Sequence, residues 1–263
     1  MRKIAILGCG NIGMSIMEGI LKEKKVEPWE ICATRRNISA SAKHVSPGVN
    51  VTDDNRRAVG ESDLIVIAVK SYNFFDVLNE IKEHLDPERH ILVSITTGIT
   101  ISEIRKEIKK GIPVFRAMPN ISASIGSSVT CISSSGAEKE HVDYVKELFD
   151  SIGTTMIIDE NLMESATILG SCGVAFVLRF IRAMIQGGIQ IGFDAATASS
   201  IVNQTVKGAA ELLIQRHQHP EYEIDKVTTP KGCTIVGLNE MEHNGFSSSL
   251  IKGIVASFEK IER

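Results

Sequence analysis

Ile4-Ala5-Ile6-Leu7-Gly8-Cys9-Gly10-Asn11-Ile12-Gly13, close to the amino terminus, decides the fold. The four apolar residues predict a buried strand, and a G-x-G-x-x-G pattern follows them directly, before apolar residues at helical spacing. In such a unit the first glycine permits a tight turn, the second lets backbone approach a diphosphate, and the third lets the helix pack closely on the strand. The motif therefore predicts a dinucleotide site. A glycine turn that serves packing alone is the alternative.

The composition excludes several classes of protein. The chain has 263 residues, enough for one large or two modest domains, and 43% of them are hydrophobic and 23% charged, as in ordinary globular proteins. Twenty-nine basic residues against 32 acidic ones give a net charge of -3, and only 5% of residues are aromatic. We therefore expect no nucleic-acid partner, because such binding needs a basic face or clustered rings.

The cysteines and the apolar stretches point to a reduced compartment. Five cysteines are present and none forms a C-x-x-C pair, so we predict free thiols and no metal site. The first apolar run is too short for a signal peptide. The most apolar of the long stretches, residues 166–185, contains Arg179 and Arg182, each of which costs about 3 kcal/mol at a bilayer centre. We expect a cytoplasmic protein with no membrane partner.

The order of elements predicts two domains. Residues 1–160 alternate short β-branched runs with amphipathic stretches, which is typical of an α/β, parallel-rich sheet covered by helices. Residues 161–263 carry only helical patterns, at 163–185, 195–216, 234–243 and 247–261. The first of these helices is apolar almost all round, so either a second subunit covers it or it lies at the centre of a monomeric bundle. The seven predicted strands cover residues 3–7, 30–33, 63–69, 91–95, 114–117, 128–132 and 156–158.

The end of the second predicted strand bears on the choice of cofactor. An NAD site usually has an acidic residue there, whereas Thr34, Arg35, Arg36 and Asn37 offer a hydroxyl and two guanidinium groups. Guanidinium groups match the oxygens of a ribose 2′-phosphate, so NADPH is favoured and NADH stays possible. An ordinary basic loop is the alternative.

Two further strand ends are candidates for the nicotinamide half of the cofactor. Ligands of open parallel sheets lie beyond the carboxyl ends of the strands, where Val69 and Lys70 follow one predicted strand and Met118 and Asn120 follow another. For Lys70, a solvated strand end is an equally good interpretation.

A turn in the helical half is the candidate substrate site. Thr229-Pro230-Lys231-Gly232-Cys233-Thr234 immediately precedes a helical pattern. The backbone amides of Gly232, Cys233 and Thr234 would be left unpaired at the positive end of the helix, where they suit a carboxylate. Simple capping of the helix is the alternative.

Together these residues resemble those of the Δ1-pyrroline-5-carboxylate reductase family, which makes proline in the last step of its biosynthesis. The resemblance spans the chain and includes Arg116-Ala117-Met118-Pro119-Asn120 and the segment 170–176. It implies an α/β Rossmann-type N-terminal domain, an all-α C-terminal dimerisation domain, and a homodimer or an oligomer of dimers. It also implies hydride transfer to the C=N bond of a cyclic imine carboxylate.

The resemblance assigns roles to individual residues. Thr234 is the predicted catalytic residue, since the family's threonine there hydrogen-bonds the ring nitrogen. Predicted substrate contacts are Thr229, Gly232, Cys233, Thr234 and Asn120, and predicted cofactor contacts are Gly8, Gly10, Asn11, Ile12, Gly13, Thr34, Arg35, Val69, Lys70, Met118 and Asn120.

Several positions depart from the family pattern and bear on which imine fits. The departures are Ser71, Ser122, Cys172, Val174, Phe176 and Lys231. A β-hydroxyacid dehydrogenase-like reductase of another small acid and a nonenzymatic NADP-binding regulator remain the alternative functions.

Overall fold

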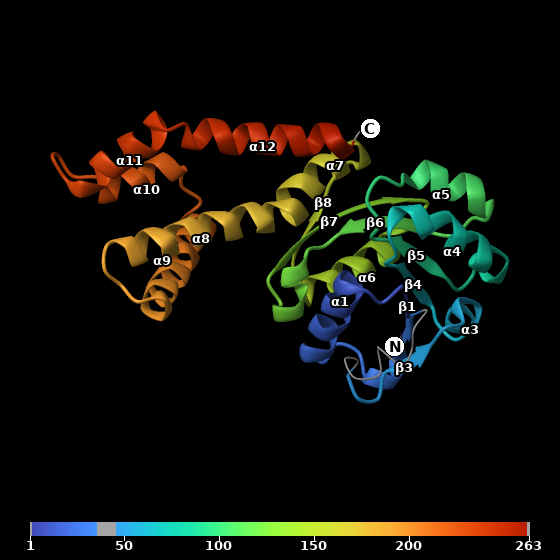
Figure 1. Ribbon diagram of the computed structural model, residues 1–263. Coiled ribbons are helices and arrows are strands. Elements are labelled where there is room, and N and C mark those ends of the chain that lie inside the picture. Colours follow the sequence, from blue (N-terminus) through green and yellow to red (C-terminus); the bar gives the residue numbers. More distant parts are fainter. Residues whose placement is uncertain (1, 36–45, 262–263) are drawn as a thin grey trace. The chain divides into compact units, whose positions relative to one another are not determined.

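The computed structural model describes residues 2–35 and 46–261, so Arg36 and Asn37 lie outside the described residues. Two compact units are present (Figure 1). One, here called the sheet unit, is Met1–Ser171 with Ile261–Arg263, and the other, the helical unit, is Cys172–Lys260. The predicted domain boundary after residue 160 stays a prediction.

The sheet unit contains eight strands among its described residues, in the order β3-β2-β1-β4-β5-β6-β7-β8. All neighbours pair in parallel except β6 and β7, which are antiparallel. The predicted parallel-rich sheet is confirmed. The strands are β1 Ile4–Leu7, β2 Ile31–Thr34, β3 Asn50–Thr52, β4 Leu64–Ile67, β5 Ile91–Ser94, β6 Val114–Met118, β7 Ser128–Ser135 and β8 Gly153–Ile157.

The prediction of seven strands was wrong by one, because β3 was missed. Only three residues long, β3 is an edge strand with no fully buried residue and so has no apolar run to reveal it. The other strands differ from their predicted bounds by up to three residues at either end.

Helices cover both faces of the sheet, as alternating residues of each strand require. Ile4 and Ile6 of β1 face one core, with α1 (Asn11–Lys22) and α6 (Lys139–Asp150). Ala5 and Leu7 face the other, with α3 (Asn55–Gly60), α4 (Phe74–Ile81) and α5 (Ile101–Ile108). Beyond β8 the chain forms a short 3₁₀ turn (Glu160–Leu162), α7 (Met163–Ala166) and a π-helical segment (Thr167–Cys172).

The helical unit contains no strand among its described residues, as predicted. Its helices are α8 (Gly173–Gln190), α9 (Ala195–Arg216), α10 (Pro220–Val227), α11 (Cys233–His243) and α12 (Phe246–Ile261), whose last residue belongs to the sheet unit. The short α10 was not predicted. It begins where His219 Nδ1 accepts a hydrogen bond from the Glu221 amide. His217, two residues earlier, is the C-cap of α9.

One helical stretch, Glu160–Gln190, is long and apolar enough to cross a membrane by length and composition, with a mean hydropathy of 1.8. Only 6% of the window is buried within the chain itself. The same feature is found in helices that a partner subunit covers.

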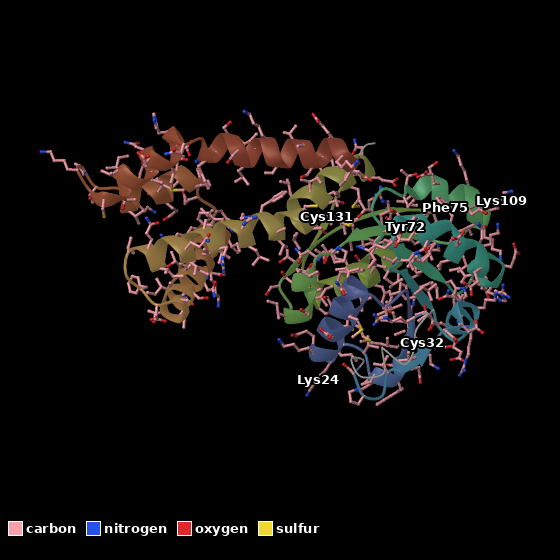
Figure 2. The ribbon with its side chains drawn as sticks, in the orientation of Figure 1. Lys24, Cys32, Tyr72, Phe75, Lys109 and Cys131 are labelled. Carbon is pink, nitrogen blue, oxygen red and sulfur yellow. The ribbon has the colours of Figure 1, made fainter. Side chains whose placement is uncertain are left out.

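All five cysteines are free thiols, as predicted. Cys32 on β2 and Cys131 on β7 lie on widely separated strands of the sheet (Figure 2). Burial raises the pKa of the Cys9 thiol, within the glycine motif, to about 11, so this side chain stays protonated at neutral pH.

Candidate active site

A cleft of about 1160 Å³ lies within the sheet unit, at the carboxyl ends of its strands. β2 lies on one side of β1 and β4 lies on the other, so the strand order reverses at β1. Parallel sheets bind dinucleotides at such a reversal. Eight of the predicted cofactor contacts line the cleft: Gly8, Gly10, Asn11, Ile12, Thr34, Arg35, Val69 and Lys70.

The glycine turn has the shape that a diphosphate requires. Gly8 has φ +85°, and a Cβ there would lie 2.3 Å from Cγ1 of Val69, so only glycine fits. A Cβ on Gly10 would have no atom nearer than the Gly8 carbonyl oxygen, at 3.9 Å, which leaves the backbone open to an approaching ligand. Gly10 also precedes α1 without a side-chain cap, so the first amides of the helix stay available to an anion.

Gly13 belongs to the packing of the turn rather than to the cleft lining. A Cβ there would lie 3.3 Å from Ile6 Cγ2 and 3.4 Å from Ala68 Cβ, so the glycine lets α1 approach β1 and β4 closely. This is the role expected of the third glycine of the motif.

Thr34 is held by a directional chain of hydrogen bonds. Its Oγ1 accepts from the Gly8 amide at 3.1 Å and donates to Asn55 Oδ1 at 2.6 Å. Asn55 Nδ2 in turn donates to Glu80 Oε2 at 2.8 Å. The Thr34 hydroxyl thus fixes the glycine turn to α3 and α4.

Asn55 and Glu80 both line the cleft, and the sequence did not reveal either residue. Asn55 opens α3, directly after the strand that was missed, so no predicted strand end pointed to it. Thr96 and Thr97, also in the lining, follow β5. Lys70 was predicted because ligands lie beyond the carboxyl ends of parallel strands, and the same rule applied to β5 would have found these two threonines.

The cleft carries both signs of charge. Arg35 and Lys70 line it together with Asp53, Asp76 and Glu80. The cations suit the phosphates of a dinucleotide, whereas the acids suit ribose hydroxyls. The residues present therefore fit a nicotinamide dinucleotide and are compatible with either form.

Met118 and Asn120 are not among the residues that line the cleft. The Asn120 side chain is used within the protein: Nδ2 donates to the Gly170 carbonyl at 2.9 Å, and Oδ1 accepts from the Ser122 amide at 2.9 Å. The residue is only 7% exposed. Its predicted contacts with cofactor and substrate stay predictions, and its observed role is to hold the backbone.

The predicted substrate turn begins a helix, as expected. Gly232 is the N-cap of α11, and Cys233 and Thr234 are its first residues. The turn itself brings Gly232 close to Thr229, so that a Cβ on Gly232 would lie 2.4 Å from Thr229 Oγ1. The amides of the first helical turn have no partner within the helix and suit a carboxylate.

One detail of that prediction was wrong. The Gly232 amide is not unpaired, since it donates to the Thr229 carbonyl at 2.9 Å and closes the turn. Only the amides that follow it are left for a ligand. Lys231, with φ +61°, occupies the position of this turn that normally requires glycine.

A glycine-lined cleft at the switch point of a parallel sheet, followed by a helical unit, defines a two-domain dinucleotide-dependent oxidoreductase. Residues 160–263 match the family model of the pyrroline-5-carboxylate reductase dimerisation domain. Residues 3–98 match a family model described as NADP oxidoreductase, coenzyme F420-dependent. The chain belongs to the pyrroline-5-carboxylate reductase family.

The assignment to this family rests on relatives that match nearly the whole chain. Pyrroline-5-carboxylate reductase 2 of Dictyostelium discoideum is 42% identical over 98% of this chain and 92% of its own length. Pyrroline-5-carboxylate reductase 1 of the same organism is 41% identical over 98% of this chain, which spans only 49% of that protein.

Solved structures agree. The Plasmodium falciparum pyrroline carboxylate reductase with NADP bound has a TM-score of 0.91 and 26% identity, with 99% of this chain and 97% of that chain covered. A 3-hydroxyisobutyrate dehydrogenase from Mycobacterium tuberculosis has a TM-score of 0.53 at 13% identity, over 72% of this chain and 65% of that one, and shares the fold alone.

Proposed function

We propose that this protein reduces Δ1-pyrroline-5-carboxylate to L-proline with NADPH or NADH, the last step of proline biosynthesis. The observation that carries the proposal is 42% identity to a pyrroline-5-carboxylate reductase over nearly all of both chains. A cleft with an open glycine turn, fit for a dinucleotide, supports it.

The reduced cofactor, when bound, supplies a hydride to the imine carbon. The hydride forms a new C–H bond there, and the π electron pair of the C=N bond passes to nitrogen. A protonated imine is already electrophilic, so the work of the protein is binding and orientation. Gly10 and the start of α1 hold the diphosphate. Val69, Lys70 and Thr96, at the ends of β4 and β5, border the nicotinamide half.

The turn before α11 binds the substrate in this proposal. The amides of Cys233 and Thr234 hold the carboxylate, with the positive end of the helix behind them. The hydroxyl of Thr234 hydrogen-bonds the ring nitrogen. Thr229 and Gly232 give the turn its shape, and Asn120 contributes by holding the loop after β6.

The enzyme is a cytoplasmic homodimer in this proposal. Free cysteines accord with a reducing compartment. The match of residues 160–263 to a dimerisation domain, and the exposed apolar side chains of the helical unit, support self-association. No nucleic-acid or membrane partner is proposed, and the apolar face of α8 is assigned to the second subunit.

One assay tests the reaction and the cofactor together. Loss of NADPH absorbance is followed with pyrroline-5-carboxylate, and the assay is repeated with NADH. Oxidation of a 3-hydroxy acid instead would indicate the hydroxyacid dehydrogenase alternative. Tight NADPH binding without reduction of any cyclic imine would indicate the regulator.

Thr234→Ala tests the substrate turn. We expect a lower turnover number and nearly unchanged NADPH affinity, because Thr234 contacts the imine and not the dinucleotide in this proposal. Asn239→Ala, at an exposed polar position five residues further along α11, is the control and should retain the wild-type rate. An unchanged rate for Thr234→Ala would remove this residue from the mechanism.

A further inference from the structure

Arg116 is the largest fully buried side chain of the described residues, and the mechanism above does not use it. It lies on β6, opposite Ser94 of β5, on the face of the sheet that α5 covers. A buried guanidinium group is costly unless it is paired, and apolar residues of similar size usually serve stability as well or better. A charged group at this position therefore calls for an explanation beyond filling the core.

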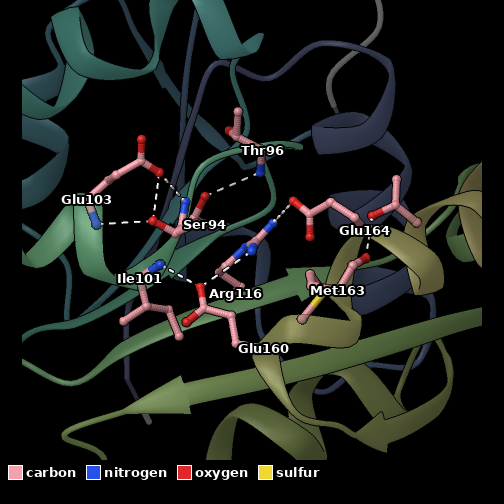
Figure 3. Close-up of polar contacts among 10 residues, drawn as sticks. Ser94, Thr96, Ile101, Glu103, Arg116, Glu160, Met163 and Glu164 are labelled. Carbon is pink, nitrogen blue, oxygen red and sulfur yellow. Dashed lines mark hydrogen bonds and ion pairs between the residues drawn. The ribbon is translucent and has the colours of Figure 1, made fainter. Parts of the chain in front are cut away.

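Two carboxylates from beyond β8 pair with Arg116 (Figure 3). Its Nη2 lies 2.9 Å from Glu164 Oε1, and its Nη1 lies 3.4 Å from Glu160 Oε1. The Arg116 side chain is 2% exposed, against 32% for Glu160 and 21% for Glu164. The fork of the guanidinium group thus fixes two points of the segment 160–164 against the sheet.

The ion pairs of Arg116 are connected to the lining of the cofactor cleft through the loop between β5 and α5. Glu160 Oε1 also accepts from the Ile101 amide, at 2.6 Å, and so holds the start of α5. The loop between β5 and α5 contains Thr96, whose amide donates to Ser94 Oγ at 3.3 Å and whose hydroxyl donates to the Val69 carbonyl at 3.0 Å. Val69 and Thr96 both line the cleft. The Arg116 pairs therefore anchor the far end of a loop that lines the cleft.

A second tether joins the same segment to the end of β6. Asn120 Nδ2 donates to the Gly170 carbonyl at 2.9 Å, and Ser171 Oγ donates to the Pro119 carbonyl at 2.8 Å. Both bonds involve the π-helical segment Thr167–Cys172, and such irregular turns are frequent at functional sites. Residues 116–120 and 160–171 are thus joined at both ends.

We propose that Arg116, acting through Glu160 and Glu164, is a positioning residue for hydride transfer. It holds the Thr96 wall of the cleft and the segment 160–171 in one arrangement. This inference rests on the proposed function, because it concerns the alignment of the nicotinamide for that reaction. Arg116 touches neither substrate nor cofactor in this role.

Arg116→Met and the milder Glu164→Gln test the proposal in the full-length enzyme. Small misplacements of reacting groups reduce rates steeply, so we expect Arg116→Met to lower kcat by about a hundredfold. Glu164→Gln, which keeps an acceptor but loses the charge, should lower it by a smaller factor. The affinity for NADP⁺ should stay close to that of the wild type. The deuterium isotope effect with 4-deuterated NADPH should rise, since hydride transfer becomes slower than product release.

Arg89→Met is the matched control. It removes a guanidinium–carboxylate pair just before β4 and β5, at the amino ends of these strands, where Arg89 Nε lies 2.7 Å from Asp63 Oδ1. We expect lower thermal stability with an unchanged kcat and isotope effect. If Arg116→Met and Arg89→Met reduce kcat equally per folded molecule, or if Glu164→Gln keeps both wild-type values, Arg116 is merely structural.

Hydrogen exchange separates this inference from the proposed function. In the NADP⁺-bound protein, Arg116→Met, which removes both pairs, should accelerate amide exchange in residues 95–101 and 163–171, whereas Arg89→Met should not. Unchanged exchange in both segments would overturn the positioning role even in an active enzyme. A wild-type protein that reduces no imine, yet shows the expected exchange pattern, would overturn the proposed function and leave the hold on the cleft wall supported.

Discussion

The sheet unit encloses its own core, whereas the helical unit leaves most of its apolar surface uncovered. Both faces of the sheet are packed, and nearly all buried apolar residues of the described chain belong to that unit. In the helical unit only Ala198 and Val202 are buried apolar residues, while large side chains such as Val177, Leu178 and Val236 are exposed. Exposed apolar surface on this scale marks an interaction site. Within one chain, the sheet unit thus buries a core on both faces of its sheet, whereas the helical unit buries almost no apolar side chain.

The largest effect is expected from a charge placed on the exposed apolar face of α8, which should disrupt the proposed dimer. Leu178 of α8 is 54% exposed within the chain. Leu178→Asp should abolish the dimer and lower reductase activity by at least about a hundredfold, because burying an unpaired carboxylate in an interface costs several kcal/mol. Light scattering gives the oligomeric state, and NADP⁺ binding by the sheet unit should survive.

Trp29→Asp is the control for this charge, since Trp29 is exposed on the sheet unit. We expect it to remain dimeric and active. A dimeric Leu178→Asp protein with wild-type activity would show that the exposed face of α8 is not the contact.

Matched glycine substitutions should separate the roles of the two units. Gly8→Ala places a Cβ 2.3 Å from Val69 Cγ1, and Gly232→Ala places one 2.4 Å from Thr229 Oγ1. Both turns must open, so Gly8→Ala should weaken NADPH binding by about tenfold or more, since strained positions cost of order 1–3 kcal/mol. Gly232→Ala should raise KM for the imine and leave NADPH affinity unchanged. Calorimetry with NADP⁺ and steady-state kinetics measure the two effects.

Gly237→Ala is the control for the second substitution, because a Cβ there would have no neighbour within 4 Å. It should keep the wild-type KM and gain about 0.5–1 kcal/mol of stability as an alanine inside a helix. Equal effects of Gly8→Ala and Gly232→Ala on NADPH affinity would contradict the division of labour.

Acid should destabilise the sheet unit through a buried histidine. His90 Nδ1 accepts from the Asp86 amide, and Nε2 lies 3.1 Å from the Ser62 carbonyl. Burial, with the nearby charge of Arg89, lowers the pKa of His90 below its ordinary value of 6.5. The neutral ring is thus favoured in the folded state, so its contribution is full above pH 6.5 and is lost as the pH falls through the lowered pKa.

Denaturant unfolding between pH 7.5 and pH 5 measures this loss. His90→Gln should flatten the decline in the free energy of unfolding, whereas His243→Gln, at an exposed position of the helical unit, should leave the slope unchanged. The same slope in all three proteins would rule out His90 as the titrating group.

The smallest effect is expected at Lys231. Its left-handed backbone, φ +61°, costs a non-glycine residue about 1 kcal/mol. A glycine removes this strain, but it also increases the conformational entropy of the unfolded chain, which offsets part of the gain in stability. Lys231→Gly should therefore raise stability by about 0.5 kcal/mol and keep reductase activity. A thermal scan measures the first, and KM for the imine shows whether Lys231 selects the substrate. A loss of stability would contradict the strain assigned to this turn.

The sequence predicted those features that depend on local patterns. The strands with apolar runs, the glycine turn, the ends of β2 and β4, and the start of α11 all followed from residue order and spacing. β3 and α10 did not, because a short exposed strand and a short polar helix carry no periodic apolar signal. Asn55 was missed together with β3, and Asn120 was assigned to ligand contacts although its amide is bound to Gly170.

By itself the sequence determined the two-unit plan, the dinucleotide class and the family, because strand periodicity, glycine turns and helix starts are encoded by neighbouring residues. Only the tertiary structure decided that Glu80 joins Thr34 through Asn55, that the Gly232 amide is already used, and that Arg116 is buried against Glu160 and Glu164. These contacts join residues that are close in space but distant along the chain, so they depend on how the folded elements pack together.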